Sequence, residues 1–386
     1  MNGVATQILR VSIDQRARLS LLRAGYDPCS SSNVYEDRPF IAIWETTQAC
    51  DLVCQHCRAC AQPSRDREEL TTEEGFALLR TFASAGVPLV VLTGGDPAKR
   101  PDLLELVRFG SAAGLHMALT PSATPLVTEE LVGQLAAAGL ERLAISVDGP
   151  DAAIHDAFRG VSGSFLHSRR ILAAARLSGI RTQINTTVHA GSIGRLRDIA
   201  RLVADLGCVL WSVFYVVPTG RAEERMLPSA EAVEASLEEI ADIAETAPFG
   251  VKTTAAPHYR RVLLQRKERR TSRPRGERVN DGRGFLFVSH RGDVYPSGFL
   301  PLPCGNVRTS DPIQIYREHP VFRSLRDGDA LSGKCRACLF RHVCGGSRAR
   351  AYAMTGSITA SDPLCAYIPP GYTGDVNVRR HLAVLP

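Results

Sequence analysis

The sequence predicts an α/β protein in which a partial (β/α)6 barrel of the TIM type precedes a small, cysteine-rich C-terminal domain. Two observations lead to this prediction. Short apolar runs alternate with amphipathic stretches from Pro39 to about Gly250, and cysteines cluster near both ends of the chain. We therefore expect an N-terminal extension over 1–38, the barrel over 39–250 and the C-terminal domain over 251–386.

Six apolar runs predict strands, because each is short and rich in Val, Ile and Leu, as in strands buried on both faces. They lie at 41–46, 88–95, 116–121, 142–149, 182–188 and 209–218. Helical patterns lie at 71–85, 102–113, 128–138, 165–178, 192–206 and 229–246, the first with Thr71 or Thr72 as its N-cap. Six strand–helix units predict a parallel sheet with right-handed crossovers, fewer than the eight units that close a barrel.

After residue 250 the pattern changes. The stretch 259–278 is strongly basic and predicts a helix that runs into a loop. Residues 284–298 predict two short strands around a turn at 291–293. The remainder is short, loop-rich and cysteine-bearing. A region with so little apolar sequence often depends on a metal site for its stability.

The composition is that of an ordinary soluble globular protein, with 386 residues, 44% of them hydrophobic and 22% charged. The formal net charge of +6 is too small to indicate a nucleic-acid partner. The first residues lack the apolar core of a signal peptide, and no apolar run is long enough to span a membrane. We therefore expect a cytoplasmic protein, whose eleven cysteines do not form disulfides and whose clustered cysteines serve as metal or iron–sulfur ligands.

The loops that follow the first four predicted strands carry the residues of chemical interest. A cysteine cluster follows the first strand, "GGDP" (94–97) ends the second, "TPSAT" (120–124) follows the third and "SVDG" (146–149) ends the fourth. Loops at the carboxyl ends of neighbouring parallel strands converge in space. We therefore expect the reactive site at this edge of the sheet.

Cys50, Cys54 and Cys57 have the spacing C-x3-C-x2-C. A tetrahedral zinc ion needs a fourth ligand, which Cys60 or His56 would supply. The segment "CDLVCQHC", followed by "GGDP", resembles the radical SAM superfamily. That resemblance implies a 4Fe–4S cluster held by three cysteines, whose open iron binds S-adenosylmethionine (SAM) and yields a 5′-deoxyadenosyl radical. Zinc remains the alternative to the cluster. If the cluster is present, Cys60 is expected not to be a ligand.

The same resemblance implies contacts to SAM from the other loops. Glycines in the second loop let the backbone approach a ligand closely, and a planar guanidinium suits the carboxylate of the methionine moiety. His155 and Asp156 are expected to support the local turn, and Asn185 is a candidate ligand contact. The expected SAM-binding residues are Gly94, Gly95, Asp96, Ser146, Asp148 and Arg159.

A second cysteine group, "CRACLFRHVC" with Cys365 beyond it, resembles the SPASM or twitch-like extension of radical SAM proteins. The resemblance implies one auxiliary 4Fe–4S cluster, fully ligated and suited to accept an electron from a substrate radical. Ser297 and Ser347 stand where many relatives have cysteine, so we expect no second auxiliary cluster. A four-cysteine zinc site remains open. The expected ligands are Cys335, Cys338, Cys344 and Cys365.

Three cysteines stand apart from both groups. Cys304 is a candidate hydrogen donor to a substrate radical, against the alternative of an inert buried thiol. Cys208 is expected to pack in the core, and the sequence assigns no role to Cys29.

The C-terminal segment is most similar to SPASM enzymes of alternative haem and haem d1 biosynthesis, which implies dehydrogenation or decarboxylation of a small molecule or a tetrapyrrole side chain. Carboxylates of such a substrate would suit a basic group formed by Arg269, Arg270, Arg273, Arg275 and Arg278. The expected protein is a radical SAM/SPASM oxidoreductase that takes electrons from a reductant such as flavodoxin or ferredoxin.

Three other functions remain open. One is maturation of a ribosomal peptide by cross-linking, although only about forty residues precede the first strand, few for a leader-binding domain. A second is dehydrogenation or epimerisation of a sugar or aminocyclitol. The third is a non-catalytic iron–sulfur scaffold, which would leave the loops after strands two to four without a purpose.

Overall fold

The computed structural model describes residues 35–267 and 279–375. Within them the strands form one nine-stranded sheet in the order β7-β6-β5-β4-β3-β2-β1-β8-β9. The strands are β1 Ile41–Glu45, β2 Leu89–Thr93, β3 His116–Leu119, β4 Arg142–Ser146, β5 Arg181–Val188, β6 Leu210–Tyr215, β7 Gly250–Thr254, β8 Phe285–Val288 and β9 Val294–Tyr295.

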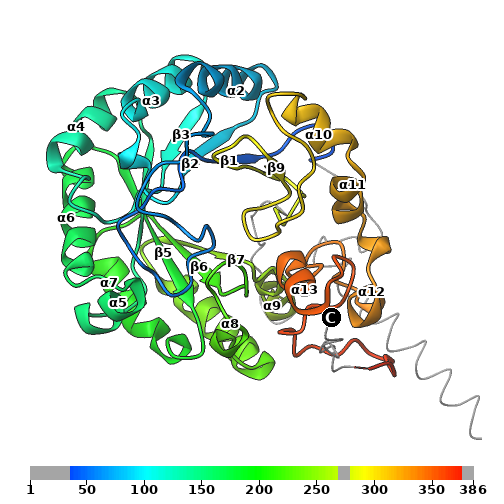
Figure 1. Cartoon of the computed structure of the whole chain (residues 1–386). Helices are drawn as coiled ribbons and strands as arrows, with labels where there is room; N and C mark the ends of the chain where they lie inside the picture. The colour runs from blue at the N-terminus through cyan, green and yellow to red at the C-terminus, as the bar shows by residue number, and fades with distance from the viewer. Residues whose placement is uncertain (1–34, 268–278, 376–386) are drawn as a thin grey trace, which may run out of the picture.

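Strands β1 to β8 all pair in parallel with one another, and β9 pairs with β8 in the antiparallel direction. The sheet curves, and the barrel helices lie on its outer side (Figure 1). The predicted fold class, a partial barrel of alternating strands and helices, is confirmed. The barrel helices are α2 Thr72–Ser84, α3 Leu103–Ala112, α4 Glu129–Ala137, α5 Ala152–Arg159, α6 Ser164–Leu177, α7 Leu196–Asp205 and α8 Ala230–Thr246.

The elements of the C-terminal part are short and lie where the arc of strands is open (Figure 1). The first of them, α9, follows β7. The elements are α9 His258–Lys267, α10 Pro312–Glu318, α11 Pro320–Arg326, α12 Gly333–Ala337 and α13 Arg348–Thr355. The five arginines of the predicted basic group lie outside the described residues.

All six predicted strands are present, and the sheet contains two further parallel strands. β7 has the sequence GVKTT, whose polar residues and N-terminal glycine conceal it from a search for apolar runs. β8 was predicted as a strand of the C-terminal region, and it pairs with β1. The sheet therefore continues past the predicted division at residue 250, and the limits of the domains stay a prediction.

Residues alternate between two faces along each strand. Outward side chains such as Trp44, Ile184 and Trp211 have no exposed surface and pack against the helices. Inward side chains such as Asn185 and Phe214 are only half-buried. The outer face thus forms the core, while the inner face of the barrel remains reachable by solvent.

The start of α2 shows how the sequence fixes a helix boundary. The Thr71 hydroxyl accepts a hydrogen bond from Glu74 N–H, and the Glu74 carboxylate accepts one from Thr71 N–H. This reciprocal capping satisfies two backbone donors that the first turn leaves without partners. Of the two expected N-caps, Thr71 is the one used. In the described part of the chain, none of the helices has the length and apolar character needed to cross a membrane.

Candidate active site

The cysteine-bearing loop directly follows β1. Cys50 and Cys54 are buried, Cys57 is half-buried and Cys60 is exposed. Each of the first three thiols lies near a donor: Leu52 N–H is 3.3 Å from Cys50 Sγ, Arg159 Nη1 is 3.7 Å from Cys54 Sγ, and Ala61 N–H is 3.4 Å from Cys57 Sγ. Donors to sulfur stabilise thiolates, which are the form that binds metal.

Among the described residues, no three His, Cys, Asp or Glu side chains converge where a single metal ion would bind. A zinc site requires four ligand atoms about 2.0–2.3 Å from one point. The thiolates of a cubane cluster instead bind separate irons at different corners.

The glycines after β2 lie against the loop that follows β1. A Cβ on Gly94 would stand 2.5 Å from Thr47 O, and one on Gly95 would stand 2.4 Å from Ala49 O. Gly95 N–H donates to Thr47 O at 2.8 Å. The close approach that requires glycine here is therefore one of backbone to backbone, which holds the cysteine loop in place; a direct role toward a ligand stays a prediction.

A Gly95→Ala variant is expected to lose about 1–3 kcal/mol of unfolding free energy, because the added methyl group forces two backbone segments apart. Gly133→Ala is the matched control, since a Cβ at Gly133, inside α4, meets no atom within 4 Å. Chemical denaturation of both variants measures the difference. Equal stability of the two would contradict the role assigned to this contact.

Asp96 is fully buried, and its carboxylate is occupied by protein donors. It accepts hydrogen bonds from Thr124 Oγ1 at 2.6 Å, Ala98 N at 3.1 Å and Ser122 N at 3.3 Å. Burial raises the pKa of this carboxyl. Ser122 also donates to Gly95 O and lies 3.2 Å from Cys50 Sγ. Asp96 thus joins the loops after β2 and β3, and its backbone N–H donates to Ala49 O at 2.6 Å. A direct contact between Asp96 and SAM stays a prediction.

The loop after β4 brings two predicted SAM contacts together. Asp148 and Arg159 form an ion pair of 2.6 Å, and the Asp148 side chain has no exposed surface. Burial opposes ionisation of Asp148, but the Arg159 charge outweighs it and lowers the pKa of the carboxyl. Because Arg159 also contacts Cys54, its guanidinium lies beside the cysteine loop. An anionic group of a ligand bound there could pair with it. Ser146 is the last residue of β4 and is half-buried.

The turn around α5 is held as expected. Asp148 N–H donates to His155 Nδ1 at 3.1 Å, and the Asp156 carboxylate accepts from Gly163 N and Phe165 N, both at 2.7 Å. The predicted supporting roles of His155 and Asp156 are confirmed.

A stack of three rings was not predicted. Phe158 lies between His56, with centroids 4.1 Å apart, and His189, with centroids 4.4 Å apart, and all three rings are nearly parallel. Burial, reinforced by the charge of Arg159, lowers the pKa of His56 to about 3. A neutral, stacked ring therefore lies inside the cysteine motif. No sequence signal connects positions 56, 158 and 189, since the fold alone brings them together.

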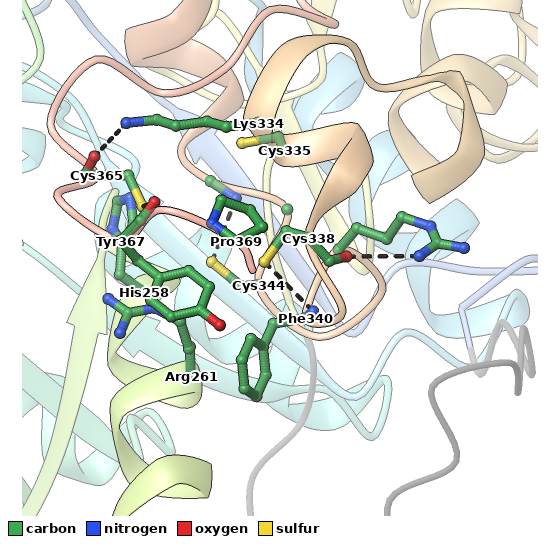
Figure 2. A pocket seen from close by; sticks show the side chains of 13 residues that line it. His258, Arg261, Lys334, Cys335, Cys338, Phe340, Cys344, Cys365, Tyr367 and Pro369 are labelled. Atoms are coloured by element: carbon green, nitrogen blue, oxygen red, sulfur yellow. Dashed lines mark hydrogen bonds between the residues drawn. The ribbon is translucent and has the colours of Figure 1, made fainter. Parts of the chain in front are cut away.

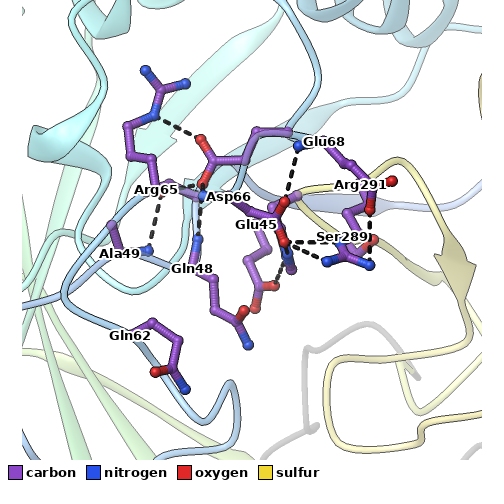
Figure 3. A network of polar contacts seen from close by, with 12 residues as sticks. Glu45, Gln48, Ala49, Gln62, Arg65, Asp66, Glu68, Ser289 and Arg291 are labelled. Atoms are coloured by element: carbon purple, nitrogen blue, oxygen red, sulfur yellow. Dashed lines mark hydrogen bonds and ion pairs between the residues drawn. The ribbon is translucent and has the colours of Figure 1, made fainter.

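A second unpredicted feature is a polar network at the ends of β1 and β8 (Figure 3). Glu45 accepts a hydrogen bond from Arg58 Nη2 at 2.6 Å and lies 2.9 Å from His290 Nδ1. Asp66 accepts from Arg291 Nη2 at 2.5 Å. Arg58 directly follows Cys57, so the network fixes the distal end of the cysteine loop to the strand that the C-terminal region contributes.

The second cysteine group lines a pocket on the C-terminal part of the protein (Figure 2). All four predicted ligands, Cys335, Cys338, Cys344 and Cys365, border it. Phe340 N–H donates to Cys338 Sγ and Gly346 N–H to Cys344 Sγ, both at 3.4 Å. The structure thus brings together residues that are thirty positions apart in the sequence, in a donor set suited to a soft metal centre.

The four thiols differ in acidity. Burial raises the pKa of Cys335, and it raises that of Cys338 to about 12. Burial also acts on Cys365, but the nearby His258 and the charges of Arg261 and Lys334 outweigh it and lower the pKa of this thiol. His258 was not predicted, and it comes from α9, outside the cysteine motif.

The remaining cysteines and the two serines have other surroundings. Cys304 is buried in the main core, where its thiol donates to Leu302 O at 3.3 Å. Cys208 is also a core residue, as expected. Ser347 caps α13 through a hydrogen bond from Arg350 N, and Ser297 accepts from Phe299 N. Cys29 lies outside the described residues. The role of Cys304 as a hydrogen donor stays a prediction.

Three comparisons place these features among known proteins. The family model described as the radical SAM superfamily matches residues 44–206. A protein of Nitratidesulfovibrio vulgaris named AdoMet-dependent heme synthase is 42% identical over 341 residues, covering 85% of this chain and 92% of that protein. A PqqA peptide cyclase of Bradyrhizobium diazoefficiens is 29% identical over 337 residues, covering 86% and 87%. Streptococcus suis SuiB bound to S-adenosylmethionine has the same fold, with a TM-score of 0.69 at 15% identity over 92% of this chain and 82% of SuiB.

The chain belongs to the radical SAM superfamily. The resemblance inferred from the cysteine motif is confirmed, and the protein is an enzyme. Membership of this family implies a 4Fe–4S cluster and SAM as cofactors. The scaffold hypothesis is thereby set aside.

Proposed function

We propose that this enzyme catalyses a haem-forming step, the oxidative decarboxylation of a propionate side chain on a tetrapyrrole. The observation that carries this proposal is the match to the protein named AdoMet-dependent heme synthase, which is 42% identical and covers 85% of this chain and 92% of that protein. The reaction needs a radical initiator, a site for an anionic substrate and an electron acceptor, and residues on this chain suit each requirement.

Cys50, Cys54 and Cys57 are proposed to hold the SAM-binding cluster. When bound, the cluster and SAM supply the 5′-deoxyadenosyl radical that abstracts a hydrogen atom. Arg159 is proposed to bind the methionine carboxylate, supported by its place beside Cys54. A reductant such as flavodoxin or ferredoxin is proposed to supply the initiating electron.

The other residues predicted to contact SAM are also proposed to do so, because they lie at the same carboxyl edge of the sheet. Ser146 and Asp148 lie at and just beyond the end of β4, and the backbone around Gly94, Gly95 and Asp96 borders the cysteine loop. Because the Asp148 carboxylate holds the Arg159 side chain, its proposed role is to orient the guanidinium as well as to contact the ribose.

A polar row crosses the inner face of the barrel. Ser146 pairs with Asn185, Asn185 with Ser212 and Ser212 with Lys252, so the row runs from β4 to β7. Since neighbouring strands lie about 4.8 Å apart, Lys252 stands about 14 Å from the β4 end of the row. A substrate between these positions would meet SAM on one side and a lysine on the other.

The surroundings of Lys252 support the proposal that the substrate is anionic. In the described part of the chain it has no carboxylate within ion-pair distance, and Arg142, on the same face of β4, has a buried Nε without a hydrogen-bond partner. Burial, followed by the charge of Arg142, lowers the pKa of Lys252 to about 8. Two cations on one inner face would favour the carboxylates of a propionate-bearing substrate.

A Lys252→Met variant is expected to raise KM roughly 10- to 100-fold, because a hydrogen bond between charged groups contributes about 1.5–3 kcal/mol. Loss of the proton should have the same effect, so wild-type KM should rise as the pH increases through about 8. Lys252→Arg is the control, since its charge persists at higher pH. Unchanged KM in Lys252→Met would contradict the contact.

The electron balance requires an acceptor. Removal of a hydrogen atom from the propionate leaves a carbon radical, which loses carbon dioxide and one electron to leave a carbon–carbon double bond. Cys335, Cys338, Cys344 and Cys365 are proposed to hold one auxiliary 4Fe–4S cluster, which would supply an electron acceptor when bound. Its support is the single pocket that the four thiols share.

The test uses anaerobically reconstituted protein with SAM, dithionite and an iron porphyrin that carries propionates. We expect 5′-deoxyadenosine, together with a porphyrin lighter by carbon dioxide and two hydrogens for each side chain converted. Formation of 5′-deoxyadenosine with an unchanged porphyrin, at saturating porphyrin, would contradict the proposed substrate. Similarity to the protein named PqqA peptide cyclase makes cross-linking of a peptide the second candidate, detected as a peptide product lighter by two hydrogens.

A further inference from the structure

The pocket bordered by the four cysteines is also bordered by basic side chains. Four of them line it directly, and a fifth, Arg348, reaches the thiol of Cys335 at 4.0 Å. The four lining residues are His258, Arg261, Lys334 and Arg341. These cations differ in whether a carboxylate of the protein neutralises them.

Two of the arginines are paired. Arg261 Nη1 donates to Glu234 Oε1 at 2.8 Å, and Arg341 Nε donates to Asp329 Oδ1 at 2.9 Å. His258 Nε2 lies 3.2 Å from Asp362. Each of these three side chains therefore has a carboxylate at ion-pair distance, although Asp362 is shared with Arg350 and Asp329 with Arg336.

Lys334 and Arg348 are different. Lys334 is 4% exposed and donates to the carbonyl oxygen of Cys365 (Figure 2). Arg348 is 2% exposed, and its guanidinium donates to the carbonyl oxygens of Gly346, Ile358 and Ala360 at 3.3, 2.9 and 2.7 Å. Carbonyl oxygens satisfy the N–H groups but do not cancel a charge. Within 35–267 and 279–375, neither cation has a carboxylate at ion-pair distance.

A buried charge without a counter-charge is costly, and proteins pair such groups or place them beside metal centres. Lys334 borders the pocket that the four thiols share, and Arg348 reaches one of those thiols. We propose that Lys334 and Arg348 are the fixed counter-charges of the auxiliary cluster and that they raise its reduction potential. This inference rests on the auxiliary cluster of the proposed function, but not on the identity of the substrate.

The physical basis is the charge of the cluster. With four thiolates, an oxidised cubane cluster carries a net charge of about −2, and reduction adds one more negative charge. Two adjacent buried cations stabilise the reduced form more than the oxidised form, because attraction grows with the charge and is weakly screened away from water. The cluster thereby becomes a better acceptor for the electron that leaves the substrate radical.

The experiment is a potentiometric titration of the reconstituted holoenzyme, followed by electron paramagnetic resonance. The auxiliary signal is the component that added SAM does not change. Lys334→Gln and Arg348→Gln should each shift its midpoint to a more negative potential, and the double variant should shift it further. Arg341→Gln is the matched control: it removes a cation from the same pocket, but one that has the Asp329 carboxylate at ion-pair distance, and it should leave the midpoint in place.

Charge-keeping variants separate charge from packing. Lys334→Arg and Arg348→Lys should retain the wild-type midpoint. If the glutamine variants fail to assemble the cluster while these assemble it, the counter-charge role is supported; equal failure of both kinds overturns it. If the glutamine variants assemble the cluster and their midpoint potentials equal that of the wild type, the proposal is overturned. It is also overturned if Arg341→Gln shifts the midpoint as much as Lys334→Gln and Arg348→Gln do. A wild-type protein with only the SAM-binding cluster, or with zinc in the pocket, also overturns it, whereas failure to convert a porphyrin leaves it standing.

Discussion

An Asp362→Asn variant is expected to lose about 3–5 kcal/mol of unfolding free energy, the typical cost of removing one partner of a buried ion pair. Asp362 and Arg350 both have fully buried side chains, and two hydrogen bonds of 2.9 and 2.7 Å join them. The asparagine keeps the shape but leaves Arg350 without its counter-charge. Chemical denaturation measures the loss, and Asp198→Asn is the control, because its ion pairs are exposed and should contribute less than about 1 kcal/mol.

The loss of unfolding free energy in Asp362→Asn is also expected to depend on pH. Burial opposes ionisation of Asp362, but the Arg350 and His258 charges outweigh it and hold the pKa of the carboxyl far below its usual range. A depressed carboxyl pKa stabilises the fold above the unfolded-state value of about 3.9, and this contribution is lost as the pH falls below it. The difference between wild type and variant should therefore be full at neutral pH and shrink in acid. A constant difference would contradict the electrostatic explanation.

A Cys54→Ala variant is expected to form 5′-deoxyadenosine only at the background rate, because it removes one of three ligands proposed for the SAM-binding cluster. Its iron content should fall from about eight to about four atoms per chain, since the auxiliary cluster remains. Chromatography of the nucleoside and iron analysis provide both readouts.

Cys60→Ala is the matched control for that variant. Cys60 lies on the same loop but is exposed, and the zinc alternative would use it as the fourth ligand. We expect it to retain its iron and its nucleoside product. If Cys60→Ala were as inactive as Cys54→Ala, the three-thiolate site would be the wrong description of this loop.

The parts of the fold that follow from local sequence could be predicted. Apolar runs located six strands, and Thr71 located the start of α2. β7 could not be found in this way, because its inward side chains face solvent-accessible space and its sequence lacks an apolar run. Pairing of β8 with β1 depends on the closure of a sheet over more than two hundred residues, which no local pattern encodes.

In the candidate site, too, features set by local sequence could be predicted and features set by long-range packing could not. The cysteine segment together with "GGDP" was sufficient to identify the family, because both are short motifs that can be read from local sequence. The sequence did not reveal that Asp96 is saturated by protein donors or that His258 reaches Cys365, since both depend on long-range packing. Lys252 was missed for a further reason: its significance lies in the carboxylate partner it lacks, and only a structure shows that.

The most direct test of the central claim is electron paramagnetic resonance of the dithionite-reduced protein, prepared without oxygen, before and after addition of SAM. A vacant iron site that coordinates SAM predicts that part of the spectrum changes on addition and that this part is missing in Cys54→Ala. A wild-type spectrum that SAM leaves unaltered would contradict the claim that Cys50, Cys54 and Cys57 hold a cluster with an open coordination position.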